Sequence, residues 1–344
     1  MKRIFIDGSA GTTGLRIRER LASRNDLELV VLPEETRKDI KARRAALNGA
    51  DVAFLCLPDA AAVEAVALVD NPDTVVIDTS TAHRTADGWE YGFPELAGRR
   101  ERIAKAKRIA NPGCHASGFI ALVEPLMRNR LITVNERLSA FSLTGYSGGG
   151  KKMIAAYDEV KVKDEGERRN VKNPSFTFTS DLHLFSGGRQ YALGQKHKHL
   201  PEMSKICGLV HEPCFSPIVV PHLSGMEVTV QLFASQFREP VTVQAIKDCY
   251  RSYYGAGDSL GERASRPFGL VRFVDDPAAA EGGFLSSAGL SGRDDLEVSV
   301  YGNDERMVLV ARFDNLGKGA SGAAIQNMNL VLGCAEEEGL KFKV

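Results

Sequence analysis

The sequence lacks long apolar runs. None approaches the ~20 residues that a membrane-spanning helix needs, and the apolar run within Met1–Asp7 is too short for a signal peptide. An excess of charge is also lacking, because 44 basic residues balance 44 acidic ones and no basic block stands out. Nucleic acid and anionic membranes are therefore not expected partners, whereas a small charged metabolite is compatible with this composition.

Paired cysteines are absent as well. The six cysteines are scattered without a Cys-x-x-Cys pair, which argues against a zinc site and against a disulfide framework in so long a chain. They are Cys56, Cys114, Cys207, Cys214, Cys249 and Cys334. Reduced thiols indicate a soluble, cytoplasmic protein without a bound metal. The 344 residues are enough for two domains.

The first third of the chain begins with a pattern typical of dinucleotide binding. A short apolar strand, Ile4–Asp7, leads into a glycine loop and then into helical spacing of Leu15, Ile17 and Leu21. The backbone N–H groups of such a loop and of the helix start can bind a pyrophosphate. The loop consists of Gly8, Ser9, Ala10, Gly11, Thr12, Thr13 and Gly14. Because its spacing is Gly-x-x-Gly-x-x-Gly and not Gly-x-Gly-x-x-Gly, a turn without a ligand is the alternative.

The end of the second predicted strand, Leu27–Leu32, bears on the choice of cofactor. In a dinucleotide fold this end meets the adenosine ribose, where an acid binds the 2′-hydroxyl of NAD and a basic residue accommodates the 2′-phosphate of NADP. Glu34 suits the first role, and Arg37 and Lys38 suit the second. The pattern favours NADP, with a solvated charged loop as the alternative.

Further strands alternate with helices along the first third. Strands are predicted at 51–57 and 74–78, with an alanine-rich helix at 60–69 between them. This alternation predicts an α/β fold with a Rossmann-like, doubly wound parallel sheet. The segment Thr79–Arg84 follows one of these strands, at the edge where open α/β sheets bind their ligands.

The middle of the chain has a different pattern. Strands at 138–144, 217–221 and 226–233 indicate an inserted α+β catalytic domain with a mixed or antiparallel sheet. The glycine loop 144–152 and the charged segment 158–173 receive no function.

The C-terminal segment is expected to return to the first domain. A strand at 308–313 leads into a loop of small residues and a helix at 323–333. The expected organisation is a dinucleotide-binding domain at 1–114, a catalytic, substrate and dimerisation domain at 115–313, and a returning C-terminal helix at 314–344.

Cys114 is the candidate nucleophile. The apolar segment Ala106–Ala110 runs into a Pro-Gly turn, Cys114 follows, and apolar residues then recur at helical spacing. Cys114 should therefore lie at or just before a helix start, where N–H groups and the helix dipole favour a thiolate. Taken alone, a buried cysteine that only packs is the more frequent case.

The segment Gly194–Met203 supplies candidates for acid/base chemistry. His197, His199 and Glu202 occur there together with two lysines. A histidine can move a proton near neutral pH, a carboxylate can orient it, and lysine can hold an anion. As a metal site the segment is weak, because no third ligand follows at a familiar spacing. The histidines interpreted as surface or packing residues are His183, His211 and His222.

Taken together, these segments resemble N-acetyl-γ-glutamyl-phosphate reductase, a family related to aspartate-semialdehyde dehydrogenase, and the similarity covers nearly the whole chain. The glycine loop and the Thr81–Arg84 form resemble the shorter of the family's two sequence types. The motifs that occur in family order are Gly8–Gly14, Asp78–Arg84, Tyr91–Leu96, Asn111–Cys114, His197–Glu202 and Asp314–Leu330. The segment 158–173 matches no motif.

The resemblance implies NADPH-dependent reduction of N-acetyl-γ-glutamyl phosphate to N-acetylglutamate semialdehyde and phosphate in arginine biosynthesis. It implies that Cys114 attacks the acyl carbon and forms a thioester. His197 is the first choice for the proton transfers and His199 the second, with Glu202 positioning the imidazole.

The resemblance also implies further site residues. Arg84 and Asn111 are candidates for the departing phosphate, for which the bidentate guanidinium is suited. Asn315 is assigned to the nicotinamide end of the cofactor, and Ser80, at a strand end, to the cofactor site. Because relatives are dimers or tetramers, a homo-oligomer is expected.

Three alternatives stay open. One is reduction of another acyl phosphate, such as β-aspartyl phosphate or a carrier-linked aminoadipyl phosphate. Another is a cysteine hydrolase that uses Cys114 and His197 without a nucleotide, against which the glycine loop argues. The third is a catalytically silent dinucleotide-binding sensor, which the presence of nucleophile, base candidates and Arg84 disfavours.

Overall fold

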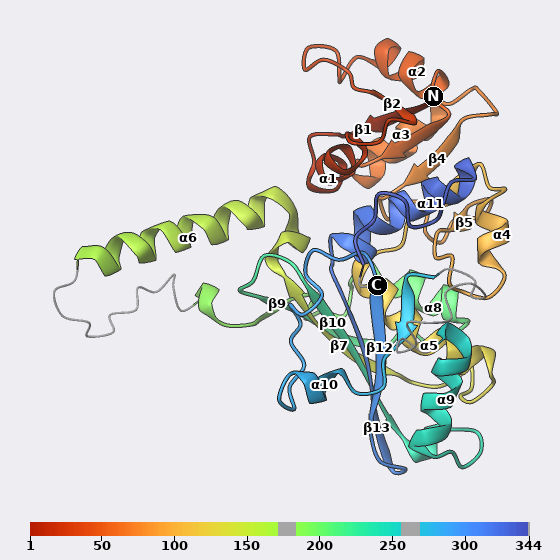
Figure 1. The fold of residues 1–344 in the computed structure, drawn as a ribbon, viewed down its shortest axis with the longest axis vertical. Helices are drawn as coiled ribbons and strands as arrows, with labels where there is room; N and C mark the ends of the chain where they lie inside the picture. The colour runs from red at the N-terminus through yellow and green to blue at the C-terminus, as the bar shows by residue number, and fades with distance from the viewer. Residues whose placement is uncertain (171–183, 256–268, 343–344) are drawn as a thin grey trace.

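The computed structural model describes residues 1–170, 184–255 and 269–342 and arranges them around two β-sheets (Figure 1). The N-terminal sheet is parallel throughout, with strand order β2-β1-β3-β4-β6-β5. Its strands are β1 (Lys2–Asp7), β2 (Leu27–Val30), β3 (Val52–Leu55), β4 (Val75–Asp78), β5 (Glu90–Tyr91) and β6 (Arg108–Ala110). The apolar sequences of its central strands are typical of strands buried on both faces.

Helices cover both faces of this sheet. The apolar residues of α1 (Thr12–Leu21) and α11 (Gly322–Leu332) share one core with the strands, and those of α2 (Ile40–Asn48) and α3 (Asp59–Ala67) share another. The Rossmann-like, doubly wound sheet is thereby confirmed. The C-terminal helix α11 lies on the N-terminal sheet, as expected, and it also contacts the short helix α4 (Arg99–Ile103).

The second sheet is mixed and has the strand order β11-β12-β13-β10-β7-β9-β8. The pairs β7/β9 and β11/β12 are parallel, and the other neighbours are antiparallel. The strands are β7 (Ser139–Gly145), β8 (Arg189–Gln190), β9 (Cys214–Val220), β10 (Met226–Phe233), β11 (Val271–Phe273), β12 (Leu296–Gly302) and β13 (Arg306–Phe313). The mixed sheet expected in the middle of the chain is thus present.

One face of the second sheet carries the main core of the molecule. Helices α5 (Cys114–Arg128) and α9 (Val243–Tyr254) pack on it, and α8 (Leu200–Cys207) packs on α5. Alternate residues of the strands, such as Val228 and Val298, are completely buried in this core. The sheet therefore holds the N-terminal end of α5, and with it Cys114, at the junction of the two sheets.

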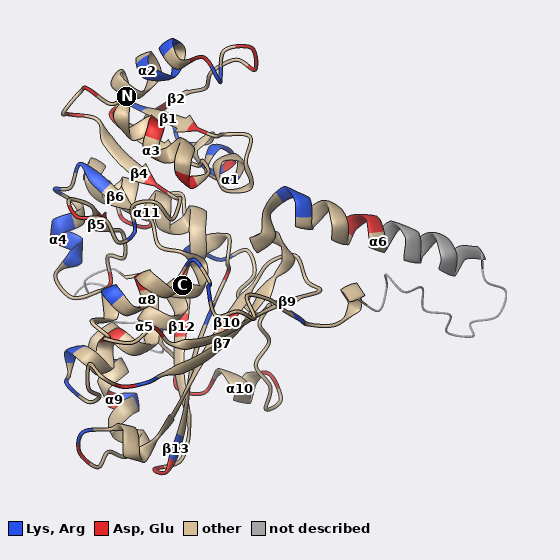
Figure 2. Ribbon diagram, turned by 180° about the vertical axis from the view of Figure 1, so that it is seen from behind, with Lys and Arg blue, Asp and Glu red and all other residues tan. Residues whose placement is uncertain are grey.

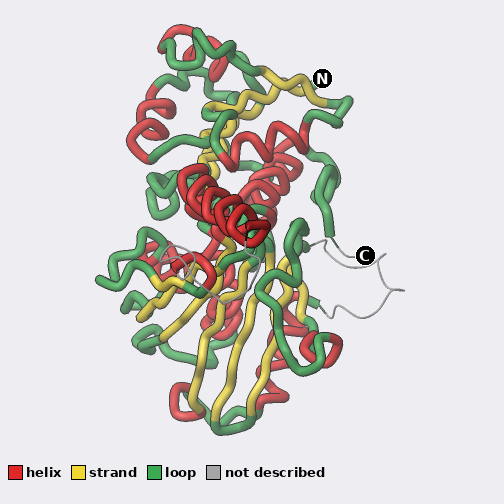
Figure 3. Tube along the Cα trace, turned by 90° about the vertical axis from the view of Figure 1, so that its left-hand side faces the viewer, coloured by secondary structure: helices red, strands yellow, loops and turns green. Residues whose placement is uncertain are grey.

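The other face of the second sheet lies open toward the viewer in Figure 3, with helices behind the strands. Phe141 and Leu143 of β7 alternate with buried residues and are only half-buried. Helix α6 (Gly150–Asn170) projects from the body on this side (Figure 1). The N-terminal half of α6 contacts the body through Tyr157, whose ring stacks on that of Tyr146 with the ring centroids 4.3 Å apart.

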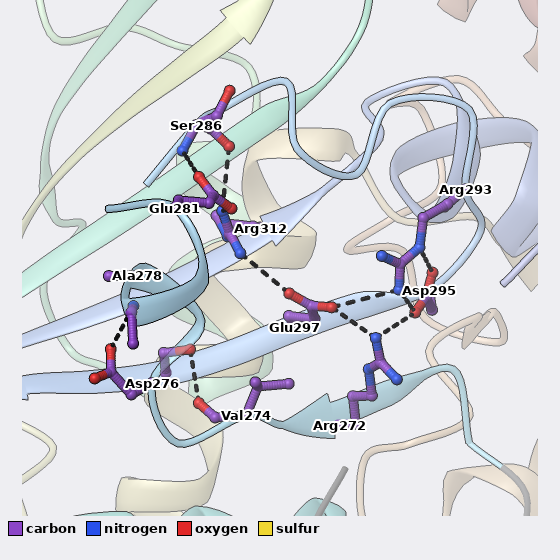
Figure 4. Close-up of polar contacts among 12 residues, drawn as sticks. Arg272, Val274, Asp276, Ala278, Glu281, Ser286, Arg293, Asp295, Glu297 and Arg312 are labelled. Atoms are coloured by element: carbon purple, nitrogen blue, oxygen red, sulfur yellow. Dashed lines mark hydrogen bonds and ion pairs between the residues drawn. The ribbon is translucent and has the colours of Figure 1, made fainter. Parts of the chain in front are cut away.

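A row of alternating charges crosses the open face near α10 (Pro277–Ala280) (Figure 4). Arg312 of β13 lies between Glu281 and Glu297, and Glu297 also pairs with Arg272 at 2.6 Å. Opposite charges on neighbouring strands stabilise their register. Elsewhere, basic and acidic residues are interspersed over the ribbon, apart from the arginines of α4 (Figure 2).

The charged segment 158–173 is compatible with a solvated helix or a loop, and its residues 158–170 continue helix α6. Residues 171–173 and His183 lie outside the described residues. Strand β12 and helix α9 had not been predicted. Both patterns are nevertheless visible in the sequence, since β12 alternates along its length and α9 has one apolar face. The remaining short helices are η1 (Tyr146–Gly149), η2 (Ala234–Gln236) and the π-helix η3 (Gly317–Ser321).

Candidate active site

The glycine loop between β1 and α1 has the geometry of a phosphate cradle. Gly8 has a φ of +85°, and a Cβ atom on it would lie 2.3 Å from the carbonyl oxygen of Cys56. A Cβ atom on Gly14 would lie 2.5 Å from the carbonyl oxygen of Gly8, so both positions require glycine. No described side chain caps α1 at Gly11, which leaves its first N–H groups open to a ligand. The loop therefore fits the pyrophosphate of a dinucleotide.

Cys114 is the first residue of α5, directly after the Pro-Gly turn, as predicted. Burial raises the pKa of the Cys114 thiol, although the charges of Arg84 and Lys198 and the backbone N–H of His115 act in the opposite direction. The backbone N–H of His115 favours the thiolate, as expected of a helix start, but the loss of hydration outweighs the favourable contributions in the free protein. The side chain is nevertheless partly exposed and can be reached by a substrate.

Glu202 of α8 joins the segments around the cysteine. Its Oε1 accepts a hydrogen bond from Nη1 of Arg84 at 2.8 Å, and its Oε2 accepts from the hydroxyl of Tyr91 at 2.7 Å and from the backbone N–H of Gly113 at 3.1 Å. The Nε2 atom of His199 lies 4.0 Å from Oε1, beyond hydrogen-bonding distance. The expectation that Glu202 orients an imidazole is corrected: its carboxylate orients the guanidinium and the turn.

His197 and His199 are neutral and lie edge to face, with ring centroids 4.7 Å apart. The backbone N–H of His199 donates to Nδ1 of His197 at 3.1 Å, which places the proton of neutral His197 on Nε2. Burial, followed by the charges of Lys198 and Arg84, lowers the pKa of His197 to about 4. Burial also lowers the pKa of His199 well below its ordinary value, and its buried Nδ1 has no partner among the described residues.

Sequence reasoning gave no role to three side chains of this site, those of His115, Tyr191 and Tyr91. His115, next to Cys114, bonds Ser142 of β7 through Nδ1 at 2.7 Å and the hydroxyl of Tyr191 through Nε2 at 2.6 Å. Tyr91 is the third missed residue, and it contacts Glu202 as described above. The motif around Cys114 could have drawn attention to His115, whereas no local pattern distinguishes Tyr191.

The π-helix η3 forms the wall behind the cysteine. A Cβ atom on Gly319 would lie 2.9 Å from Cβ of Cys114, and Nδ2 of Asn111 donates to the carbonyl oxygen of Ala320 at 3.1 Å. On its other side η3 contacts α1, the helix that follows the glycine loop. The proposed dinucleotide loop and the cysteine are therefore neighbours of the same short helix, and such π-turns are frequent at functional sites.

Arg84 lies beside the turn but is already engaged. Its Nε donates to the carbonyl oxygen of Asn111 at 3.0 Å, and its Nη2 donates to that of Thr79 at 3.1 Å. The structure thus brings Arg84 and Asn111 together next to Cys114. The side-chain amide of Asn111 is used within the protein, so phosphate binding by these two residues stays a prediction.

The polar groups of Asn315 and Ser80 are also used within the protein. Asn315 accepts from the backbone N–H of Gly225 and donates to Ser147, both at 3.0 Å. The hydroxyl of Ser80 donates to Asp78 at 2.7 Å. Both residues therefore shape the walls of the site, and direct contact with a cofactor stays a prediction.

Arg37 and Lys38 lie together in an exposed turn after β2. Glu34 forms an ion pair with Arg37 in this turn. The guanidinium of Arg37 is therefore held at the surface by the same acid that had been considered for NAD. Contact with a 2′-phosphate stays a prediction for both basic residues.

In the part of the chain that the structure describes, no three His, Cys, Asp or Glu side chains are placed to hold a metal ion. Within those same ranges, no helix combines the length and the apolar composition needed to cross a bilayer.

Family models and solved structures identify the class of this fold. Residues 3–106 match the model described as semialdehyde dehydrogenase, NAD binding domain, and residues 179–315 match semialdehyde dehydrogenase, dimerisation domain. The fold is similar to aspartate semialdehyde dehydrogenase II of Vibrio cholerae in complex with ASA (18% identity, 97% and 98% of the two chains, TM-score 0.69). It is also similar to the aspartate semialdehyde dehydrogenase of Francisella tularensis (13% identity, 96% and 100% of the two chains, TM-score 0.70). The chain therefore has a semialdehyde dehydrogenase fold.

Curated relatives identify the family within this class. The chain is 42% identical to N-acetyl-gamma-glutamyl-phosphate reductase 2 of Nostoc sp. over 98% of this chain and 99% of the relative. It is 41% identical to the reductase of Brucella ovis over 96% and 99% of the two chains. The chain belongs to the N-acetyl-γ-glutamyl-phosphate reductase family.

The space around Gly113 yields a first prediction. A Cβ atom there would lie 2.3 Å from Nη1 of Arg84 and 2.6 Å from Nε2 of His199. Gly113→Ala should lower the catalytic rate by about 100-fold or more, because the groups around Cys114 must move by a substantial part of an ångström. Gly187→Ala, where a Cβ atom meets nothing within 4 Å, is the matched control for steady-state assays. Equal rates for the two variants would contradict the packing described here.

The buried neutral histidines yield a prediction for stability. Burial lowers the pKa of both His115 and His199 well below the ordinary value of about 6.5. The unfolded chain therefore binds these protons first as the pH falls, and the folded state loses stability below about pH 6.5. At pH 5.5 each histidine should cost roughly 1 kcal/mol relative to pH 7.5.

Urea unfolding at these two pH values measures this loss. His115→Gln should remove part of the pH dependence, and His211→Gln, which alters a histidine outside the cluster, should retain it. A free energy of unfolding that does not change between the two pH values would show that these histidines are not held neutral.

Proposed function

We propose that this protein reduces N-acetyl-γ-glutamyl phosphate to N-acetylglutamate semialdehyde and phosphate with NADPH, as a step of arginine biosynthesis. The observation that carries the proposal is the position of η3, which contacts Cys114 on one side and the helix of the glycine loop on the other. A nucleophile and a dinucleotide site that share one wall can act on the same carbon atom. The relatives named above, with which the chain shares a family, bear the name of this reaction.

The acyl-transfer step uses Cys114. The sulfur bonds to the acyl carbon, the bond from that carbon to the phosphate oxygen breaks, and the thiol proton leaves with hydrogen phosphate. Because burial raises the pKa of Cys114, the thiol stays protonated until the substrate is bound. The nearby guanidinium of Arg84 favours both the thiolate and the departing phosphate by its positive charge.

The reductive step needs a group that stabilises oxygen. NADPH, when bound, supplies a hydride to the thioester carbon. The former carbonyl oxygen then carries negative charge, toward which the Nε2–H of His197 donates. A neutral imidazole with a strongly lowered pKa is a known kind of electrophilic donor. When the carbon–oxygen double bond forms again, the carbon–sulfur bond breaks, the aldehyde leaves, and the sulfur takes up one proton that comes from solvent. His197 is the first choice for the carrier of this proton and His199 the second.

The cofactor residues complete the proposal. The loop Gly8–Gly14 would hold the pyrophosphate, Arg37 and Lys38 the 2′-phosphate, and Ser80 and Asn315 would line the path to the nicotinamide. We expect Arg37→Ala to raise KM for NADPH about tenfold or more while KM for NADH changes little, because only NADPH carries the phosphate. An equal change for both cofactors, measured by initial rates, would remove Arg37 from this role.

The reverse reaction tests the function most directly. Purified protein with N-acetylglutamate semialdehyde, NADP and phosphate should form NADPH, and omission of phosphate should abolish this formation. NADPH formation without phosphate would indicate an ordinary aldehyde dehydrogenase that transfers its thioester to water. If nothing forms with this aldehyde, aspartate semialdehyde is the next substrate, and a rate with that compound alone would replace the proposed substrate.

Cys114→Ser should lower this rate by several orders of magnitude, because a serine hydroxyl ionises far less readily than a thiol. NADPH binding, measured by fluorescence titration, should be unchanged, because the glycine loop is intact. Cys214→Ser, at an exposed cysteine far along the chain, is the matched control. A near-normal rate in Cys114→Ser would contradict the covalent mechanism.

The open face of the second sheet is the proposed contact between subunits, in a dimer or tetramer. The family model that matches this part of the chain is a dimerisation domain, and Phe141 and Leu143 offer half-buried apolar surface there. Phe141→Asp should reduce the molar mass found by light scattering, whereas Val63→Asp, at an exposed apolar residue of α3 in the N-terminal domain, should not. We place the enzyme in the cytoplasm, because its function requires Cys114 to stay reduced.

A further inference from the structure

The hydrogen bonds of His115 have a direction that the neighbouring residues determine. Its Nδ1 lies 2.7 Å from Oγ of Ser142, and its Nε2 lies 2.6 Å from the hydroxyl of Tyr191. Burial and the neighbouring His197 lower the pKa of His115 well below its ordinary value, so that its ring carries a single proton. Only one of the two nitrogens can therefore donate.

Ser142 decides which nitrogen carries the proton. Its side chain is completely buried, and His115 is its only hydrogen-bond partner among the described residues. If Nδ1 of His115 donated to Ser142, the serine proton would be buried without an acceptor, which is costly. The satisfied arrangement has Ser142 donating to Nδ1. His115 then carries its proton on Nε2 and donates it to the oxygen of Tyr191.

This arrangement leaves the phenol proton of Tyr191 free. The ring of Tyr191 lies 5.7 Å from that of His197, and its hydroxyl bonds His115, the residue that follows Cys114 in the chain. No hydrogen bond joins Tyr191 to Cys114 in the described structure. The phenol proton is therefore available to a group that the sulfur carries.

We propose that Tyr191 is a second hydrogen-bond donor to the oxygen of the acyl group carried by Cys114, and that Ser142 and His115 are positioning residues that keep its proton turned toward this oxygen. The inference rests on the proposed function, since it takes Cys114 as the nucleophile. Together with Nε2–H of His197, the phenol forms a pair of neutral donors around the negative oxygen of the reductive step.

Steady-state kinetics of the phosphate-dependent reaction test this inference. Tyr191→Phe should lower kcat about 100-fold, the usual effect of losing one such donor, and leave KM for the aldehyde within about twofold. Tyr157→Phe is the matched control, because this tyrosine belongs to the same aromatic cluster and its buried hydroxyl has no partner among the described residues. It should behave as the wild type.

The positioning role is tested by Ser142→Ala. Without the serine donor, His115 can accept from Tyr191, so kcat should fall although Ser142 does not face the substrate. In the Tyr191→Phe background the same substitution should have no further effect, because the proton that it directs is gone. Additive losses in the double variant would contradict the proposed hydrogen-bond chain from Ser142 through His115 to Tyr191.

Two other results would overturn the inference. A raised KM with unchanged kcat in Tyr191→Phe would show that the phenol binds a remote part of the substrate. Full activity would show that the phenol takes no part in the reaction. The rate of the wild type shows whether such a result contradicts only the role of Tyr191 or also the proposed function. An inactive wild type contradicts both, whereas an active wild type with an unaffected Tyr191→Phe contradicts the inference alone.

Discussion

The buried carboxylate of Glu202 is the contact on which the geometry of the site depends. It accepts from Arg84, from Tyr91 and from the backbone of Gly113, and so it ties α8 to the segments after β4, in β5 and before α5. A buried carboxylate is tolerated only when its oxygens are satisfied, and here a guanidinium, a phenol and an amide do so. The same contacts fix the turn that presents Cys114. Removing the carboxylate would leave the buried hydroxyl of Tyr91 and the N–H of Gly113 without this acceptor.

Most of the ionisable groups around this carboxylate are held in their uncharged form. Burial keeps the imidazoles of His115, His197 and His199 neutral and raises the pKa of the Cys114 thiol. In the free protein the reacting groups are therefore uncharged, and Arg84 is held in place by the carboxylate. Charge develops only when a substrate brings its phosphate to this surface. A thiol with a raised pKa reacts more slowly with oxidants and alkylating agents than a thiolate does.

The sequence allowed prediction of the features that are local. The glycine loop, the turn before Cys114 and the alternation of strands and helices each depend on neighbouring residues, and each is present in the structure. The roles of Tyr91, Tyr191 and Ser142 could not be predicted, because each arises from contact between segments far apart in the chain. Glu202 was expected to position an imidazole, but its oxygens accept from Arg84, Tyr91 and Gly113, partners that lie far from it in the sequence.

The wall formed by η3 has a consequence for motion between the two sheets. The chain leaves the N-terminal sheet through Asn111–Cys114 and returns to it through η3, and these two crossings touch at Gly319 and Cys114. Because both crossings pass beside Cys114, a displacement of either sheet would be felt at this residue. The reacting sulfur is therefore positioned by the substrate and the cofactor halves at once.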